Sequence, residues 1–161
     1  MQKNLITEQG FQKFVEEFHH LVQKEKPYWV KEKEIAAAHG DRSENAEYIC
    51  AKEMLRNIDK RLRFLEKIIN NSEVINTLQL THNKVNFGSK VLVIDLTTLE
   101  KKIFIIVGTF ETNPSENKIS NISPLGKKLL GSEIGDEIEF VINNTTFDYE
   151  VISIEKYKYE E

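Results

Sequence analysis

The feature that most constrains the fold of this chain is a long series of apolar residues at alternating spacings of three and four. The series comprises Tyr48, Ala51, Leu55, Ile58, Leu62, Leu65 and Ile69. This is the a/d pattern of a coiled coil, whose apolar seam has to pack against another helix. The sequence therefore predicts one long helix here and a helical partner for it.

The partner helix is expected just before this segment. Its apolar stripe consists of Phe11, Phe14, Phe18 and Leu21. Thr7 is a suitable N-cap for this helix, Pro27 is expected to interrupt or bend it, and Gly40 is a suitable residue to end it. The connection that follows is short, so the two helices are expected to run antiparallel as a hairpin.

The second half of the chain is rich in Val, Ile, Thr and Phe, which favour strands. Strands are expected within 89–95, 102–110, 137–143 and 146–154. Asn143-Asn144 predicts a tight hairpin turn. A short helix is expected within residues 123–131, with Ser123 as its N-cap, Pro124 as its first residue and Gly131 just past its end. We therefore expect an α+β protein, with a helical hairpin over residues 1–80 and a β-domain over residues 81–161.

Composition excludes several classes of protein. The 161-residue chain has a net charge of −4, which argues against general nucleic-acid binding. Cys50 is the only cysteine, so an internal disulfide is excluded and a reducing compartment is favoured. The N-terminus has no apolar leader segment, and no apolar run is long enough to cross a membrane. We expect a monomeric, cytoplasmic protein.

The connection between the two helices, HGDRSENAEY over residues 39–48, is acidic. In a structural interpretation, Asp41 caps the second helix and Glu44 completes a capping box. In a functional interpretation, these carboxylates complete a metal site in a partner, because two or three of them are too few for an ion that prefers about six oxygens. Such a site could activate a water for phosphodiester attack. The two interpretations are compatible, since a capped helix is a rigid support.

A basic stripe follows the second helix. It consists of Lys52, Arg56, Lys60, Arg63 and Lys67, with Arg61 beside it. Interleaved acids make a solvated face with internal ion pairs one interpretation, and guidance of a phosphate backbone along the hairpin is the other. The sequence contains no Gly-rich phosphate loop or Ser-centred elbow, so an autonomous catalytic site is not predicted.

Residues 39–69, HGDRSENAEYICAKEMLRNIDKRLRFLEKII, resemble the coiled-coil tip and second helix of the bacterial Gre transcript-cleavage factors. The resemblance continues through LITEQGFQKFVEEFHHLVQKEKP, VNFGSKVLVID and ISNISPLGKKLLGSEIGDEIEF, and so covers nearly the whole chain. The segments GDRSENAEY and RNIDKRLRFL lean toward the GreB type rather than the GreA type.

The resemblance implies a helical hairpin followed by an FKBP-like β-domain. It implies that the chain is not an enzyme but a factor that binds bacterial RNA polymerase at its secondary channel and stimulates the polymerase's own cleavage of backtracked RNA. Asp41 and Glu44 would help to hold a magnesium ion of the polymerase, with Ser43 and Asn45 in support, and the chain would have no cofactor of its own. The family also implies contacts of Lys52, Arg56, Lys60 and Arg63 with the nascent RNA 3′ end, and polymerase docking at Ser123 and Pro124.

Some residues depart from the family pattern. LGKKLLG follows Ser123-Pro124 in place of an Ala-Arg run, and Ile49-Cys50-Ala51 is less polar than usual, which implies a weaker grip on RNA. Two alternatives stay open: a non-cleaving Gre-fold protein that occupies or blocks the polymerase channel, and a coiled-coil module that associates with itself.

Overall fold

The computed structural model describes residues 3–40 and 44–159, which belong to two compact units. One unit spans residues 11–71. The other combines the segment that ends at Gly10 with the segment that begins at Ser72. None of the helices in the described ranges has the length and apolar character needed to cross a membrane.

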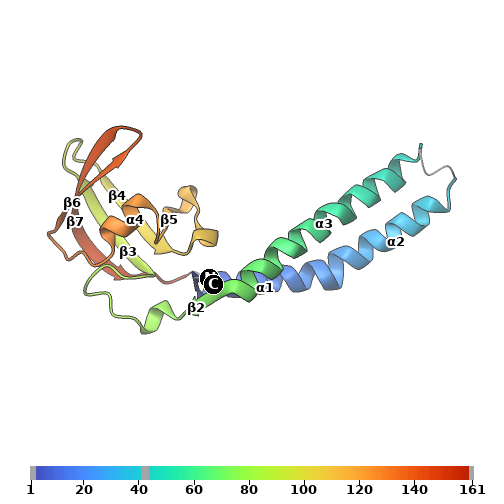
Figure 1. Cartoon of the computed structure of the whole chain (residues 1–161), viewed down its shortest axis with the longest axis horizontal. Helices are drawn as coiled ribbons and strands as arrows, with labels where there is room; N and C mark the ends of the chain where they lie inside the picture. The colour runs from blue at the N-terminus through green and yellow to red at the C-terminus, as the bar shows by residue number, and fades with distance from the viewer. Residues whose placement is uncertain (1–2, 41–43, 160–161) are drawn as a thin grey trace. The chain divides into compact units, whose positions relative to one another are not determined.

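The helical unit is a hairpin of consecutive helical segments (Figure 1). Helix α1 spans Glu8–His20, a π-helical turn η1 spans Leu21–Glu25, α2 spans Lys26–Ala37, and α3 spans Ala46–Asn71. Thr7 is the N-cap of α1, as expected, because its Oγ1 accepts the Gly10 N–H at 3.1 Å. Gly40 has a φ of 128°, a backbone conformation that favours glycine.

The α-helix is interrupted directly before Pro27, as expected, although the chain stays helical there as a π turn. The Lys26 N–H donates to the carbonyl of Leu21, five residues earlier, so η1 is a widened turn. In an ordinary α-helix, the proline ring would clash with the carbonyl four residues before it. The wider π turn immediately before Pro27 accommodates the ring, and α2 continues from there.

The predicted seam holds the hairpin together. Ala51, Ile58 and Leu65 of α3 are 1%, 6% and 0% exposed. Near the end of α3, Ile68 is buried and the expected Ile69 is only half-buried. Two ion pairs join the helical segments across the seam: Lys26 with Asp59 at 2.8 Å, and Arg61 with Glu17 at 2.8 Å. Apolar packing and charge pairing therefore fix the same antiparallel register.

The second unit contains two sheets. Strands β1 (Asn4–Thr7) and β2 (Ser72–Ile75) pair in parallel. The larger sheet has the order β5-β4-β3-β7-β6 and consists of Lys118–Ser120, Lys101–Val107, Ser89–Asp95, Thr145–Lys156 and Glu137–Ile142. Its pairs are antiparallel except for β4 with β5. Three short 3-10 turns lie at Thr77–Gln79, Thr109–Glu111 and Pro114–Glu116.

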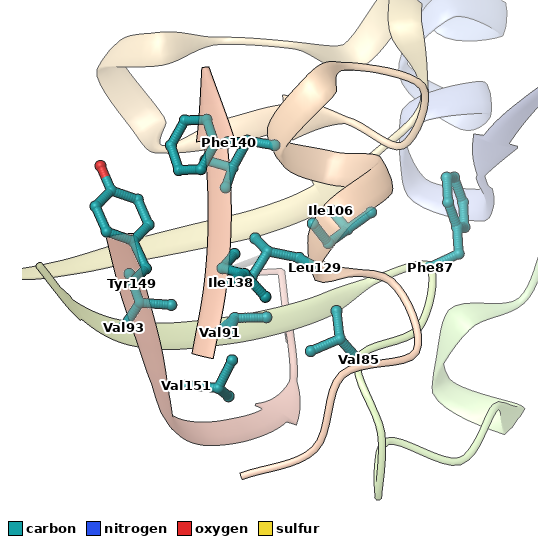
Figure 2. Packing of buried hydrophobic residues seen from close by; sticks show 11 residues of the cluster. Val85, Phe87, Val91, Val93, Ile106, Leu129, Ile138, Phe140, Tyr149 and Val151 are labelled. Atoms are coloured by element: carbon teal, nitrogen blue, oxygen red, sulfur yellow. The ribbon is translucent and has the colours of Figure 1, made fainter. Parts of the chain in front are cut away.

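Helix α4 (Pro124–Leu129) packs over the larger sheet and closes its core (Figure 2). Val91, Val93, Ile106, Leu129 and Val151 are each at most 1% exposed. The Asn143-Asn144 turn is confirmed, with φ values of 51° and 64° that fit a type I′ hairpin turn. The expected α+β class, a helical hairpin followed by a β-domain with a short helix, is therefore observed.

Glu111 anchors the N-terminal segment to this unit. Its Oε2 accepts the Thr7 N–H at 3.0 Å and the Gly108 N–H at 2.9 Å, and its Oε1 accepts the Thr7 hydroxyl. The Tyr159 hydroxyl donates to Thr7 Oγ1 at 2.9 Å, and burial raises the pKa of Tyr159 to about 12. Gly10 allows this approach, since a Cβ there would lie 2.0 Å from Glu111 Oε1.

These contacts explain how the units divide the chain. The first ten residues and Ser72–Leu80 fall with the β-unit, whereas the sequence analysis expected one division between residues 80 and 81. Strands β1 and β2 were not expected at all. Their pairing, together with the Glu111 contacts, draws the beginning of the chain onto the second unit.

Candidate functional site: the hairpin tip

The candidate site is the connection between α2 and α3. Asp41 and Ser43 lie outside the described residues, so the acidic pair is represented by Glu44 alone. Glu44 and Asn45 immediately precede α3, which begins at Ala46. The end of α2 and the start of α3 thus bring the residues that flank the site to one end of the hairpin (Figure 1).

Asn45, not Asp41, is the N-cap of α3. Its Oδ1 accepts the Tyr48 N–H at 3.1 Å, and its Nδ2 donates to the Ala36 carbonyl at 2.7 Å. The capping box expected from Asp41 and Glu44 is therefore wrong. The helix begins one residue after Asn45, and asparagine caps as well as aspartate. These two bonds join the start of α3 to the end of α2, and the expected role of Asn45 in supporting cleavage stays a prediction.

Glu44 is exposed, and no contact with a described residue holds its side chain in place. Its side chain makes no hydrogen bond or ion pair with any other residue in the ranges 3–40 and 44–159. As far as the described residues are concerned, this exposed carboxylate is available to coordinate a cation. The same described ranges contain no group of three or more His, Cys, Asp or Glu side chains that could hold a metal ion by itself.

The basic stripe is exposed along α3, and the fold uses only part of it. Arg56 pairs with Glu53 at 3.1 Å on the same helix, and Arg61 is taken up by Glu17 across the hairpin. Lys52, Lys60 and Arg63 make no ion pair with a described residue and point to solvent. The internal ion pairs of the structural interpretation are therefore observed at Arg56 and Arg61, and guidance of a phosphate backbone by the other cations stays a prediction.

Ser123 and Pro124 begin α4 in the β-unit. Ser123 Oγ accepts the Gly126 N–H at 3.0 Å and donates to the Ser120 carbonyl at 2.7 Å. Pro124 occupies the first helical turn and is exposed. The hydroxyl of Ser123 thus caps α4 and binds the preceding segment, and Pro124 and Ile122, which is 56% exposed, are exposed beside it.

The fold defines a class: an α+β protein with a helical hairpin and a five-stranded β-domain. Comparison with known proteins gives the family. The family model described as "Transcription elongation factor, N-terminal" matches residues 4–74, and "Transcription elongation factor, GreA/GreB, C-term" matches residues 80–156. The chain belongs to the GreA/GreB family of transcription elongation factors.

Curated relatives agree over nearly the full length. The chain is 42% identical to transcription elongation factor GreA of Thermodesulfovibrio yellowstonii over 92% of this chain and 94% of the relative. It is 41% identical to GreA of Wolinella succinogenes over 96% and 95%. Because these relatives carry the GreA name, the expected leaning toward GreB is not supported.

Solved structures with a similar chain path include the GreA factor homolog 1 (Gfh1) protein of Thermus thermophilus. Its sequence identity is 21% and its TM-score 0.44, over 96% of this chain and 99% of that chain. A GreA/GreB factor from Nitrosomonas europaea is 18% identical with a TM-score of 0.43, over 98% of this chain and all of that chain.

Proposed function

We propose that this protein is a transcription elongation factor that binds bacterial RNA polymerase through its secondary channel and stimulates cleavage of the 3′ end of backtracked nascent RNA. The polymerase, and not this chain, breaks the phosphodiester bond. Membership of the GreA/GreB family over both units supports this function. Because bacterial RNA polymerase works in the cytoplasm, we place the protein there, acting as a monomer.

The observation that carries the proposal is that Asn45 makes the structural hydrogen bonds at the tip while no described residue binds the Glu44 side chain. Asn45 supplies the cap of α3 and the bond to α2, so Glu44 has no structural duty among the described residues. A carboxylate that no described residue binds, positioned just before a capped helix, is suited to act on a partner. Asp41, three residues earlier in the sequence, would provide the second carboxylate.

The residues present fit a shared magnesium ion better than a resident one. Two carboxylates supply only part of the octahedral oxygen shell that magnesium requires, so the remaining ligands would belong to the polymerase. A magnesium ion bound in this way supplies activation of water for phosphodiester attack. This chain contributes the two oxygen ligands from Asp41 and Glu44, while Asn45 fixes the turn and Ser43 supports it.

Two further surfaces serve the same function. The exposed cations Lys52, Lys60 and Arg63, with Arg56, would attract the phosphates of the extruded RNA. In the β-unit, the exposed Pro124, positioned by the Ser123 cap, would belong to the surface that docks on the polymerase. Each contact leaves the carboxylates free to act.

The test is a stalled, backtracked elongation complex of a bacterial polymerase incubated with magnesium and this protein. The wild type is expected to shorten the RNA from its 3′ end. Asp41→Ala and Glu44→Ala are each expected to lower the cleavage rate at least about tenfold, the order seen when groups that support a metal site are removed. Their affinity for polymerase should be nearly unchanged, because neither carboxylate is the cap of α3.

The controls separate the alternatives. Slowed elongation at saturating wild-type protein, without any cleaved RNA, would favour a non-cleaving channel binder. A stable dimer in sedimentation that fails to retain polymerase would favour self-association through the seam. Either result would contradict the proposed function.

A further inference from the structure

A groove with a volume of about 450 Å³ lies between α2 and α3 beside the hairpin tip. Ala36 and Ala51, which are 2% and 1% exposed, form its floor. Their small side chains leave space where larger residues would fill the seam. The groove therefore lies within the helical unit and extends along α2 from its first turn to its last, against the first turns of α3.

The walls of the groove are apolar and exposed. Tyr28 is 56% exposed and Ile35 is 45% exposed, although both are large apolar side chains on a surface helix. Tyr28 meets Trp29 edge to face, with ring centroids 5.1 Å apart, so the aromatic wall is already organised. Contiguous exposed apolar surface of this kind typically marks an interaction site.

The groove is continuous with the tip. Asn45 donates to the carbonyl of Ala36, which is a floor residue, and Ala46, the first residue of α3, also lines the groove. A partner that receives Glu44 therefore lies within reach of the groove as well. This step rests on the proposed function, in which that partner is RNA polymerase.

Charge decides which component of the complex fits. Among the described residues, the charged side chains that line the groove are Glu32 and Glu47, and none of the lining residues is basic. These carboxylates repel RNA phosphates and favour Lys or Arg. The basic stripe points elsewhere: Cys50 lines the groove, and Lys52 lies about 200° further around α3 at 100° per residue. RNA bound along the stripe would therefore not occupy the groove, which would stay accessible to a segment of protein.

We infer that this groove is a second polymerase-binding site, which takes a protein segment of the channel that receives the hairpin. The segment it fits presents an apolar side chain flanked by Lys or Arg. The apolar side chain would lie between Tyr28 and Ile35 over the alanine floor, and the basic neighbours would face Glu32 and Glu47. Burial of an aromatic and aliphatic wall gives such a contact most of its energy, and the acids give it specificity.

The first experiment compares matched variants in polymerase affinity. Ile35→Ser and Glu32→Lys should each weaken binding about tenfold, a loss typical of a central interface residue. Val30→Ser and Glu34→Lys make the same chemical changes about 140° and 200° away around α2 and should leave affinity unchanged. Val30 and Ile35 are both exposed, so their effects on folding should match, which helicity by circular dichroism checks.

The second experiment identifies the occupant directly. A photo-crosslinking side chain replaces Ile35 in the full chain, bound to a backtracked complex with labelled RNA. Crosslinks to a polymerase subunit support the inference. Crosslinks to RNA, or to a second copy of this chain, overturn it, and so does equal binding by Ile35→Ser and Val30→Ser.

The experiments distinguish a wrong inference about the groove from a wrong proposed function. If the wild type stimulates cleavage while the groove variants bind as tightly as their controls, only the groove inference fails. If the wild type neither binds polymerase nor stimulates cleavage, the proposed function fails and the inference falls with it.

Discussion

Asn45 joins the two helices at the tip through two hydrogen bonds of one side chain. It caps α3 through Tyr48 and donates to the end of α2 at Ala36. We expect Asn45→Ala to destabilise the hairpin by about 1 kcal/mol through loss of the cap, and to lower cleavage because Glu44 loses its rigid support. Denaturant unfolding followed by circular dichroism measures the first effect.

Asn45→Asp is the matched control for this prediction. Aspartate keeps an oxygen that can cap α3 but lacks the amide donor that binds the Ala36 carbonyl. Its stability should fall between that of the wild type and Asn45→Ala. If Asn45→Ala is as stable as the wild type, Asn45 does not cap the helix in solution, and the capping role would return to Asp41.

Tyr159 gives the β-unit a predictable loss of stability at high pH. Burial raises its pKa from 10.0 to about 12, because the phenolate is less well solvated in the folded protein. The folded state therefore holds this proton more tightly than the unfolded chain. This contribution to stability is complete below pH 10 and is lost as the pH rises through about 12.

Tyr159→Phe removes this titration along with the hydrogen bond to Thr7. The variant should have a lower free energy of unfolding than the wild type below pH 10. The difference between the two free energies should become smaller as the pH approaches 12. Denaturant unfolding at a series of pH values measures this difference. A difference that stays constant across the series would show that ionisation of Tyr159 does not affect stability.

Among the elements, the β6–β7 hairpin depends on a turn that few residues tolerate. Asn144 has a φ of 64°, which a β-branched residue adopts only with strain. Asn144→Val should destabilise the β-unit by about 1–2 kcal/mol. Thr145→Val, at the first residue of β7, should have little effect because an extended strand suits valine. Thermal unfolding of the two variants measures this difference. An equal fall in unfolding temperature for Asn144→Val and Thr145→Val would show that the backbone conformation of Asn144 is not the cause.

Elements with local signals could be predicted from the sequence, and elements built by distant contacts could not. The seam of α3, the Thr7 and Ser123 caps and the Asn143-Asn144 turn each depend on residues close together in sequence. Strands β1 and β2 have only four residues each, too few to display alternation, and they are stabilised by pairing with one another. Their existence follows from a long-range contact that periodicity does not reveal.

The start of α3 was mispredicted because the sequence offers two signals. Asp41 with Glu44 matches a capping box, while Asn45 is an equally good cap four residues later. Which one is used depends on where α2 ends, because the Asn45 amide also binds Ala36. Which cations of the basic stripe form ion pairs could likewise not be predicted without the register of the hairpin. That register brings Glu17 to Arg61 but leaves Lys52 and Lys60 unpaired among the described residues.

At the scale of the whole molecule, the net charge is −4, and acidic and basic side chains gather on different surfaces. Exposed cations follow α3, and acids line the groove between α2 and α3. Glu44, which has no partner among the described residues, precedes α3. The β-unit carries its own apolar core and an exposed Ile122-Pro124 surface. Under the proposed function, these separate surfaces would contact RNA, metal and protein of the polymerase complex at different places.

The central claim is that this chain supplies oxygen ligands to a magnesium ion held by RNA polymerase. The most direct test measures the cleavage rate of a backtracked complex as a function of magnesium concentration, with saturating wild-type protein or with Glu44→Gln, which keeps the side-chain shape and removes the charge. We predict that Glu44→Gln requires at least about tenfold more magnesium for half-maximal cleavage. The same magnesium requirement for both proteins would contradict the claim.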